Sequence, residues 1–171
     1  MTLSMSKIPF TIAVMLVLGL PLSSQSFAAQ VSARREIGGA LAFEVPSLHV
    51  SGTLIAAAGN RLIALTLTLG DEPIETDVRR FVLVTSSGRY EPIGAGASAE
   101  SLIPLDRIPL NKEVGVILPT DAIVALTRES AASVILEVGP RGTVTFLYEV
   151  SLGATVRSLR LPDGRELAAT P

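Results

Sequence analysis

The chain of 171 residues is long enough for one domain with its own hydrophobic core, and its formal net charge is only −2. So small a charge excludes the basic surface that nucleic-acid binding requires. The sequence contains no cysteine, which excludes a disulfide framework and a lipid attached at a lipobox cysteine, so the core alone must stabilise the fold.

The first 28 residues have the pattern of a secretory signal peptide. Lys7 is the only charged residue among them, and residues 8–22 form an apolar run of the length expected for a signal-peptide core. Ser26 and Ala28 are the small residues that a signal peptidase needs at positions −3 and −1. The sequence therefore predicts cleavage after Ala28, which leaves 143 residues with a formal charge of −3.

A membrane anchor is the alternative interpretation of this segment. A spanning helix needs about 20 apolar residues, whereas Pro9 and Pro21 bracket the apolar run too closely. We therefore expect an exported protein, periplasmic or extracellular, with no membrane span after signal cleavage. The absence of cysteine suits a bacterial envelope better than a eukaryotic secretory pathway.

The residues that follow predict a loose lead and then short strands. Residues 29–39 are small or charged and end in glycine, which is typical of a flexible N-terminal lead. Residues 40–52 contain one or two short strands, with Pro46 at an edge or a break. The clearest strand is residues 61–70, where side chains alternate between two faces. The more apolar face, which we expect to be buried, contains Ile63, Leu65, Leu67 and Leu69.

Three later segments with turn signals predict pairs of strands. In residues 79–94, Gly88 supplies a turn residue that adopts positive φ readily. In residues 133–150, Pro140 suits a type I turn and predicts a second hairpin. Residues 155–167 predict a strand, a Pro-Asp-Gly turn and a short strand. The side chains that we expect to be buried between two sheets are Leu65, Leu67, Phe81, Leu83, Phe146 and Tyr148.

Residues 94–133 carry weaker patterns. We expect the Gly/Ala/Ser-rich residues 94–101 to form a loop. We expect residues 113–118 to form a strand, because a structureless stretch of this length is unusual in a compact domain. Residues 119–130 fit either a short helix with Thr120 as its N-cap or an irregular strand.

Short strands at a spacing of roughly 8–12 residues predict an all-β fold, an antiparallel β-sandwich formed by a single domain over residues 40–171. Three motifs stand out: Gly70-Asp71-Glu72-Pro73 after the core strand, Tyr90 after the hairpin glycine, and Phe146 with Tyr148 on a late strand. They resemble the immunoglobulin-like domains of unknown function found in exported bacterial proteins and lipoproteins. The resemblance covers about residues 40–165.

The resemblance implies an immunoglobulin-like sandwich of seven to nine strands outside the cytoplasm, and it implies no reaction. This chain differs from many members of that family because it lacks the lipobox cysteine. Its residues 94–133 are also longer and richer in proline than the usual connection.

The residues with catalytic potential do not form the pattern of an enzyme. His49 is the only histidine, and no Gly-x-Ser-x-Gly motif is present for a Ser-His-Asp hydrolase. One histidine without cysteine does not make a typical zinc or copper site, and Met1, Met5 and Met15 all lie in the predicted signal peptide. We predict no catalytic residue and no cofactor, and we place His49 at the face or edge of a strand.

The strongest candidate for a binding site is an acidic turn between two apolar strands. Its carboxylates are Asp71, Glu72, Glu75 and Asp77. They are neighbours at one turn, whereas a glycosidase needs two carboxylates flanking a cleft. Calcium takes about six to eight oxygen ligands, but the turn lacks D-x-D-x-D-G spacing and Pro73 stiffens it. We expect Arg79 and Arg80 to neutralise part of its charge. We therefore favour an exposed connection between sheets over a calcium site, and we expect no metal.

The sequence as a whole favours an exported, non-enzymatic immunoglobulin-like domain that binds a protein or cell-envelope partner through a loop or a sheet edge. The alternative is a small-molecule or metal-ion (calcium) binding protein that uses the acidic turn at residues 71–77 or the loop at residues 94–133. An apolar pocket closed by that loop would favour the alternative, and a flat exposed edge would favour the first hypothesis.

Overall fold

The computed structural model describes residues 28–117 and 123–169. These residues form fifteen strands and three short 3₁₀ helices, η1 (Pro46–Leu48), η2 (Val78–Arg80) and η3 (Leu105–Arg107), and they contain no α-helix. Every pair of neighbouring strands within a sheet is antiparallel. The prediction of an all-β antiparallel fold is confirmed. There are more strands than the expected seven to nine, because several have only two or three residues.

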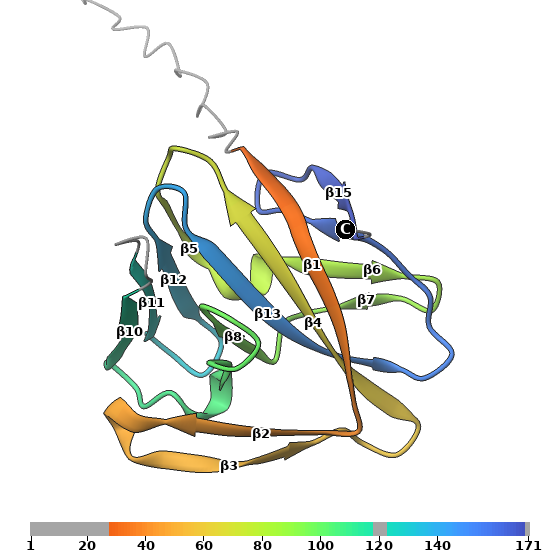
Figure 1. The fold of residues 1–171 in the computed structure, drawn as a ribbon, viewed down its shortest axis with the longest axis horizontal. Coiled ribbons are helices and arrows are strands. Elements are labelled where there is room, and N and C mark those ends of the chain that lie inside the picture. The colour runs from red at the N-terminus through yellow and green to blue at the C-terminus, as the bar shows by residue number, and fades with distance from the viewer. Residues whose placement is uncertain (1–27, 118–122, 170–171) are drawn as a thin grey trace, which may run out of the picture.

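The first sheet has five strands and forms the front layer in Figure 1. Its order is β1 (Ala29–Gly38), β4 (Asn60–Leu69), β13 (Thr143–Ser151), β8 (Gly94–Gly96) and β9 (Ile103–Pro104). The long strands β4 and β13 pair along nine positions at its centre. In both strands, apolar side chains recur at every second position on one face, as the sequence predicts for β4.

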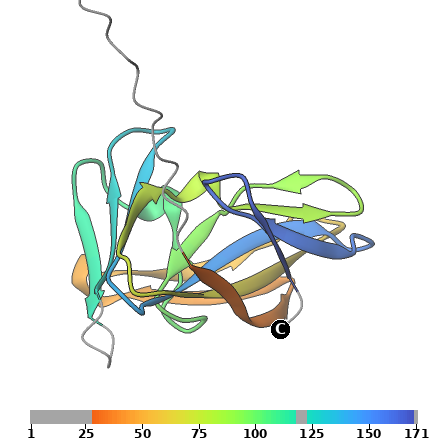
Figure 2. The same cartoon turned by 90° about the horizontal axis from the view of Figure 1, so that it is seen from above.

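Two four-stranded sheets lie behind the first sheet, and Figure 2 shows them on one side of it. The second sheet has the order β10 (Glu113–Ile117), β11 (Ile123–Arg128), β12 (Val134–Val138) and β5 (Ile74–Asp77). The third sheet has the order β15 (Glu166–Ala168), β14 (Val156–Arg160), β6 (Val82–Thr85) and β7 (Arg89–Tyr90). A separate hairpin, β2 (Ala40–Val45) with β3 (Val50–Ile55), lies at the lower end in Figure 1.

The main core lies between the first sheet and the two sheets behind it. All six side chains that the sequence assigns to the core are fully buried, namely Leu65, Leu67, Phe81, Leu83, Phe146 and Tyr148. The Phe81 and Phe146 rings stack with their centroids 4.5 Å apart. The Tyr148 hydroxyl donates a hydrogen bond of 2.9 Å to the Phe81 carbonyl, and burial raises the pKa of Tyr148 well above its ordinary value. The sandwich prediction thus agrees with the packing.

The first sheet is buried on its second face as well. Leu62, Ala64 and Leu147 point away from the main core and form a second cluster with Leu102. Apolar residues from the β2–β3 hairpin and from residues 93–99 pack against them. Alternation places Leu62 and Ala64 on the opposite face of β4 from the residues that the sequence expects to be buried. That face is buried as well, because a second layer of chain covers it.

Residues 29–38 are the edge strand β1 of the first sheet, so the prediction of a flexible lead over residues 29–39 is wrong. None of the β1 side chains is fully buried, which explains why the residues lack an apolar pattern. Their order comes from the backbone ladder with β4, which begins at the pair Ala29 and Leu69 and ends at Gly38 and Leu62.

Residues 133–150 do not form the predicted hairpin. β12 pairs with β11 and β5 in the second sheet, whereas β13 pairs with β4 and β8 in the first. The turn between them crosses the sandwich, with Arg141 in the left-handed region at φ 56° and its backbone N–H donating to the Gly70 carbonyl at 2.7 Å. The other two predicted strand pairs are confirmed as β6 with β7 and β14 with β15.

The segment 94–133 contains more strand than the sequence predicts. Residues 94–96 form β8 instead of part of a loop, and a Cβ at Gly96 would lie 2.2 Å from the Ser101 carbonyl oxygen. The predicted strand at 113–118 is β10, except for residue 118, which lies outside the described residues. Residues 123–128 form β11, which favours the strand alternative, and the proposed cap Thr120 lies outside the described residues.

Candidate functional site

The acidic turn connects the first sheet to the second, as the sequence predicts, because β4 ends at Leu69 and β5 begins at Ile74. Asp71 lies in the exposed part of the turn and pairs with Arg141 of the β12–β13 turn. This hydrogen bond raises the pKa of Arg141 above its ordinary value. Two turns far apart in sequence are thus held side by side, and one of the four carboxylates is engaged with a cation.

The other three carboxylates of the turn lie at separate positions and do not gather around one point. Glu72 is exposed next to Asp71, while Asp77 lies at the far end of β5. The Asp77 Oδ1 atom accepts a hydrogen bond of 2.9 Å from the Arg79 backbone N–H and so caps the helix η2. Glu75 projects from the middle of β5. Among the described residues, no group of three or more His, Cys, Asp or Glu side chains is arranged to hold a metal ion.

Arg79 and Arg80 do not neutralise the acidic turn, which corrects the sequence-based expectation. The Arg79 guanidinium donates to the Ala131 carbonyl, and the Arg80 guanidinium donates to the Pro162 carbonyl, each at 2.9 Å. Both residues belong to η2, which turns the chain from the second sheet to the third, and their guanidinium groups bind carbonyls away from Asp71.

We expect calcium to leave the thermal stability of the protein unchanged, because the four carboxylates do not converge and Asp71 already has a cationic partner. Isothermal titration with calcium and melting curves in calcium or chelator test this. The matched variant replaces Asp71, Glu72, Glu75 and Asp77 by Asn or Gln. Micromolar binding that disappears in this variant would contradict the expectation.

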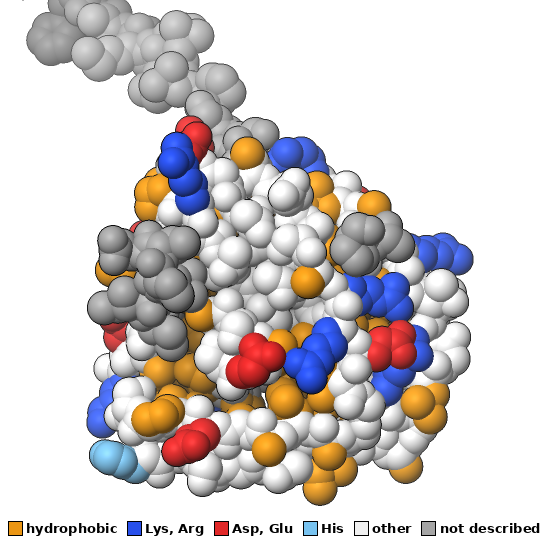
Figure 3. Space-filling model, in the orientation of Figure 1, with side chains coloured by type: hydrophobic (Ala, Val, Ile, Leu, Met, Phe, Trp, Pro, Cys, Tyr) orange, Lys and Arg blue, Asp and Glu red, His pale blue; other side chains and the backbone are white. Residues whose placement is uncertain are grey.

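His49 lies at the tip of the β2–β3 hairpin, where it follows η1 (the single pale blue side chain in Figure 3). Its backbone adopts φ 53° and its N–H donates to the Pro46 carbonyl at 3.1 Å. His49 therefore closes a turn between two strands, and the prediction that places it on a strand is wrong by one residue. Figure 3 shows acidic and basic side chains interspersed on the front face, in keeping with the small net charge.

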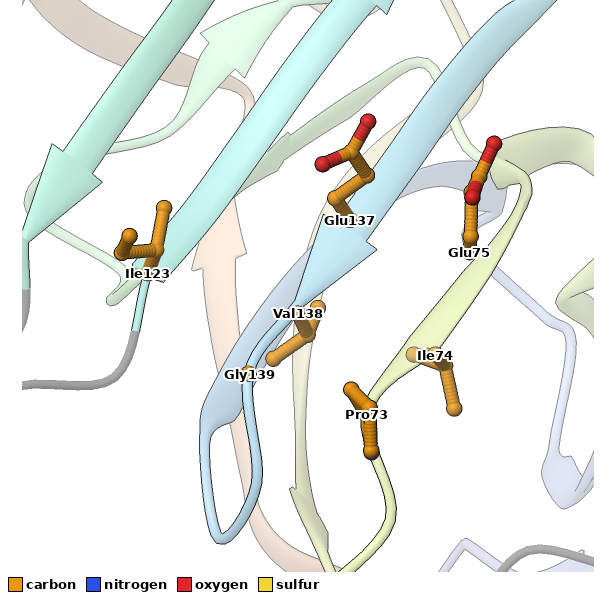
Figure 4. A pocket seen from close by; sticks show the side chains of 7 residues that line it. All are labelled: Pro73, Ile74, Glu75, Ile123, Glu137, Val138 and Gly139. Carbon is orange, nitrogen blue, oxygen red and sulfur yellow. The ribbon is translucent and has the colours of Figure 1, made fainter.

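An open hollow of about 540 Å³ lies at the end of the second sheet nearest the β12–β13 turn (Figure 4). Its lining residues are Pro73, Ile74, Glu75, Ile123, Glu137, Val138 and Gly139. Among these described residues, Ile123 alone belongs to residues 94–133. The Ile123 side chain is 52% exposed beside the hollow.

Glu75 and Glu137 lie opposite each other in the hollow, on the neighbouring strands β5 and β12. Residues directly opposite in an antiparallel pair share a face of the sheet with Cβ atoms about 4.5–5.5 Å apart. Both residues are exposed, and no ion pair joins either of them to a cation in the described part of the chain. The sequence pointed to Glu75 but missed Glu137, whose only signal is that it interrupts the apolar run of β12.

Replacing Glu137 by lysine should stabilise the protein by about 0.2–1 kcal/mol, because a cross-strand repulsion with Glu75 becomes an attraction. Urea denaturation of the two proteins at low salt measures the difference. The control is Glu44→Lys, which lies opposite Ser51 in the β2–β3 hairpin and should gain less. Equal or lower stability of Glu137→Lys would show that the two carboxylates do not interact.

Comparison with protein-family models, with curated proteins and with solved structures found no match. The class of protein therefore follows from the fold: an all-β protein of several antiparallel sheets, consistent with a β-sandwich. None of the helices in the described ranges is long and apolar enough to cross a membrane.

Proposed function

We propose that this protein is an exported, non-enzymatic domain of immunoglobulin-like type that binds a protein or cell-envelope partner. The observation that carries the proposal is the hollow on the second sheet, which is open and lies on a sheet face beside the edge strand β5. Small-molecule sites are more often concave clefts that bury most of their ligand. An open, partly apolar sheet surface suits the side chains of another protein.

Two further observations support this proposal over a small-molecule or calcium-binding protein. Residues 93–105 form part of the core, since Leu102 and Ile103 are buried and Ile93 packs on the first sheet. That part of the 94–133 segment therefore packs on the first sheet and does not form a free binding loop. In the acidic turn, Asp71 and Asp77 already have partners within the protein.

Export agrees with the position of the first strand. β1 begins at Ala29, so cleavage after Ala28 removes no residue from any described strand. We expect N-terminal sequencing of the protein from the envelope fraction to begin at Ala29. Recovery of intact Met1 in an integral membrane fraction would contradict export with cleavage.

Cross-linking in an envelope extract, followed by affinity purification of the tagged protein, tests partner binding. We expect one protein to be recovered in near-equal amount and to be displaced by excess untagged protein. Recovery of no specific protein, together with saturable binding of a small molecule, would favour the alternative function.

A further inference from the structure

The face of the second sheet around the hollow carries an unfavourable charge pair that the protein does not compensate. Glu75 and Glu137 are in register on β5 and β12, exposed and of like charge. The next outward pair along these strands is Asp77 with Ile135, which adds an acid and no base. The nearest arginine in sequence to Glu75 is Arg79, which donates to the Ala131 carbonyl, and the nearest to Glu137 is Arg141, which pairs with Asp71.

Apolar surface lies directly beside the two carboxylates. Ile123 is half exposed at the start of β11, and Pro73 is exposed just before β5. Figure 4 shows these two side chains on either side of the β12 end, with Glu137 and Glu75 further along the strands. An aliphatic group placed here would bury apolar surface while a neighbouring cation meets the carboxylates.

The strand β5 is the last in the order of the second sheet, so its outer side pairs with no strand in the described part of the chain. An edge strand presents backbone N–H and C=O groups to which an extended peptide can add. Its pairing with β12 covers only four positions, from Ile74 to Asp77. A short extended segment therefore matches the length of this edge.

We propose that this face, formed by Glu75, Glu137, Ile123 and Pro73 beside the edge of β5, docks an extended segment of a protein partner that carries a lysine or arginine next to an aliphatic side chain. The proposal rests on the proposed function and specifies its site and the chemistry of its partner. A small organic cation fits less well, because the hollow is open and none of its described lining residues is aromatic.

The test uses the exported protein labelled with ¹⁵N and three capped octapeptides, with alternating Val and Lys, Val and Glu, or Ser and Lys. We expect the Val/Lys peptide to shift the amide signals of β5, β12 and Ile123, and to bind at least tenfold more tightly than the other two. Its affinity should fall as salt rises, because the charges are exposed.

The variant that carries both Glu75→Gln and Glu137→Gln should lose at least tenfold in affinity for the Val/Lys peptide. It should melt no lower than the natural protein, since the change removes a repulsion, and this separates lost binding from lost folding. The matched control carries Glu44→Gln and Glu91→Gln, two exposed acids outside this face, and should bind normally. Unaltered binding by the first variant, or equal binding of the Val/Glu peptide, would overturn the proposal.

A second variant separates the failure of this proposal from the failure of the proposed function. The variant with Glu75→Lys and Glu137→Lys should fail to capture the envelope partner that the natural protein captures. If the variant and the natural protein capture the partner equally, the proposal for this site is overturned, but the proposal that the protein binds a partner still stands. Binding of the Val/Lys peptide at this face without any envelope partner would support the site and count against the proposed function.

Discussion

Replacing Phe146 by alanine should lower the free energy of unfolding by about 3–5 kcal/mol. Phe146 is fully buried in β13, stacks on Phe81 and lies 6.5 Å from the Tyr148 ring, centroid to centroid. Removing the ring leaves a cavity between the first sheet and the sheets behind it, where the surrounding strands relax only in part. Urea denaturation of the exported protein followed by circular dichroism measures the loss.

Two further variants serve as comparisons for Phe146→Ala. Leu147→Ala removes a fully buried side chain from the opposite face of β13, and it should cost about 2–5 kcal/mol because residues from the β2–β3 hairpin and residues 93–102 cover that face. His49→Ala, at an exposed hairpin turn, should cost far less. A small cost for Leu147→Ala would mean that the second face is open to water.

Removing residues 29–38 should sharply lower the melting temperature and make the protein aggregate. β1 contributes no fully buried side chain, so the loss comes mainly from its backbone ladder with β4, at about 0.5–1.5 kcal/mol for each hydrogen bond. The truncation also exposes the edge of β4, an apolar strand of ten residues and a template for pairing with other chains. Thermal melts and size-exclusion chromatography measure both effects.

The control is the protein that begins at Ala29, which retains the whole strand. Adding a synthetic peptide of residues 29–38 to the truncated protein should restore part of the lost stability, because the peptide can reoccupy the edge of β4. A truncated protein that melts at the same temperature as the control would show that these residues are the flexible lead that their composition suggests.

Of the two carboxylates on the proposed docking face, Glu75 and Glu137, only Glu75 could be found from the sequence. Glu75 attracts notice because it lies in an acidic turn, whereas Glu137 is a single acid within a strand. Their proximity depends on the register between β5 and β12, which a contact between distant segments sets. Likewise, Arg141 becomes the partner of Asp71 only because two turns from different parts of the chain meet at one end of the sandwich.

The features that could be predicted from the sequence are local ones. Alternation identified β4 and the buried faces of Leu65, Leu67 and Phe146, since neighbouring side chains on a strand must point to opposite sides. Turn chemistry located the short strand pairs, as at Gly164, which adopts φ 89° between β14 and β15.

The tertiary structure alone decided which sheet each strand joins. A turn such as that at residues 139–142 connects strands equally well within one sheet or across a sandwich, so only the packing of the whole chain separates β12 from β13. Strand β1 is the extreme case, because its side chains are never fully buried and its order comes from backbone hydrogen bonds to a distant strand. Every residue except proline carries the same backbone donor and acceptor, so the side-chain pattern does not reveal such a ladder.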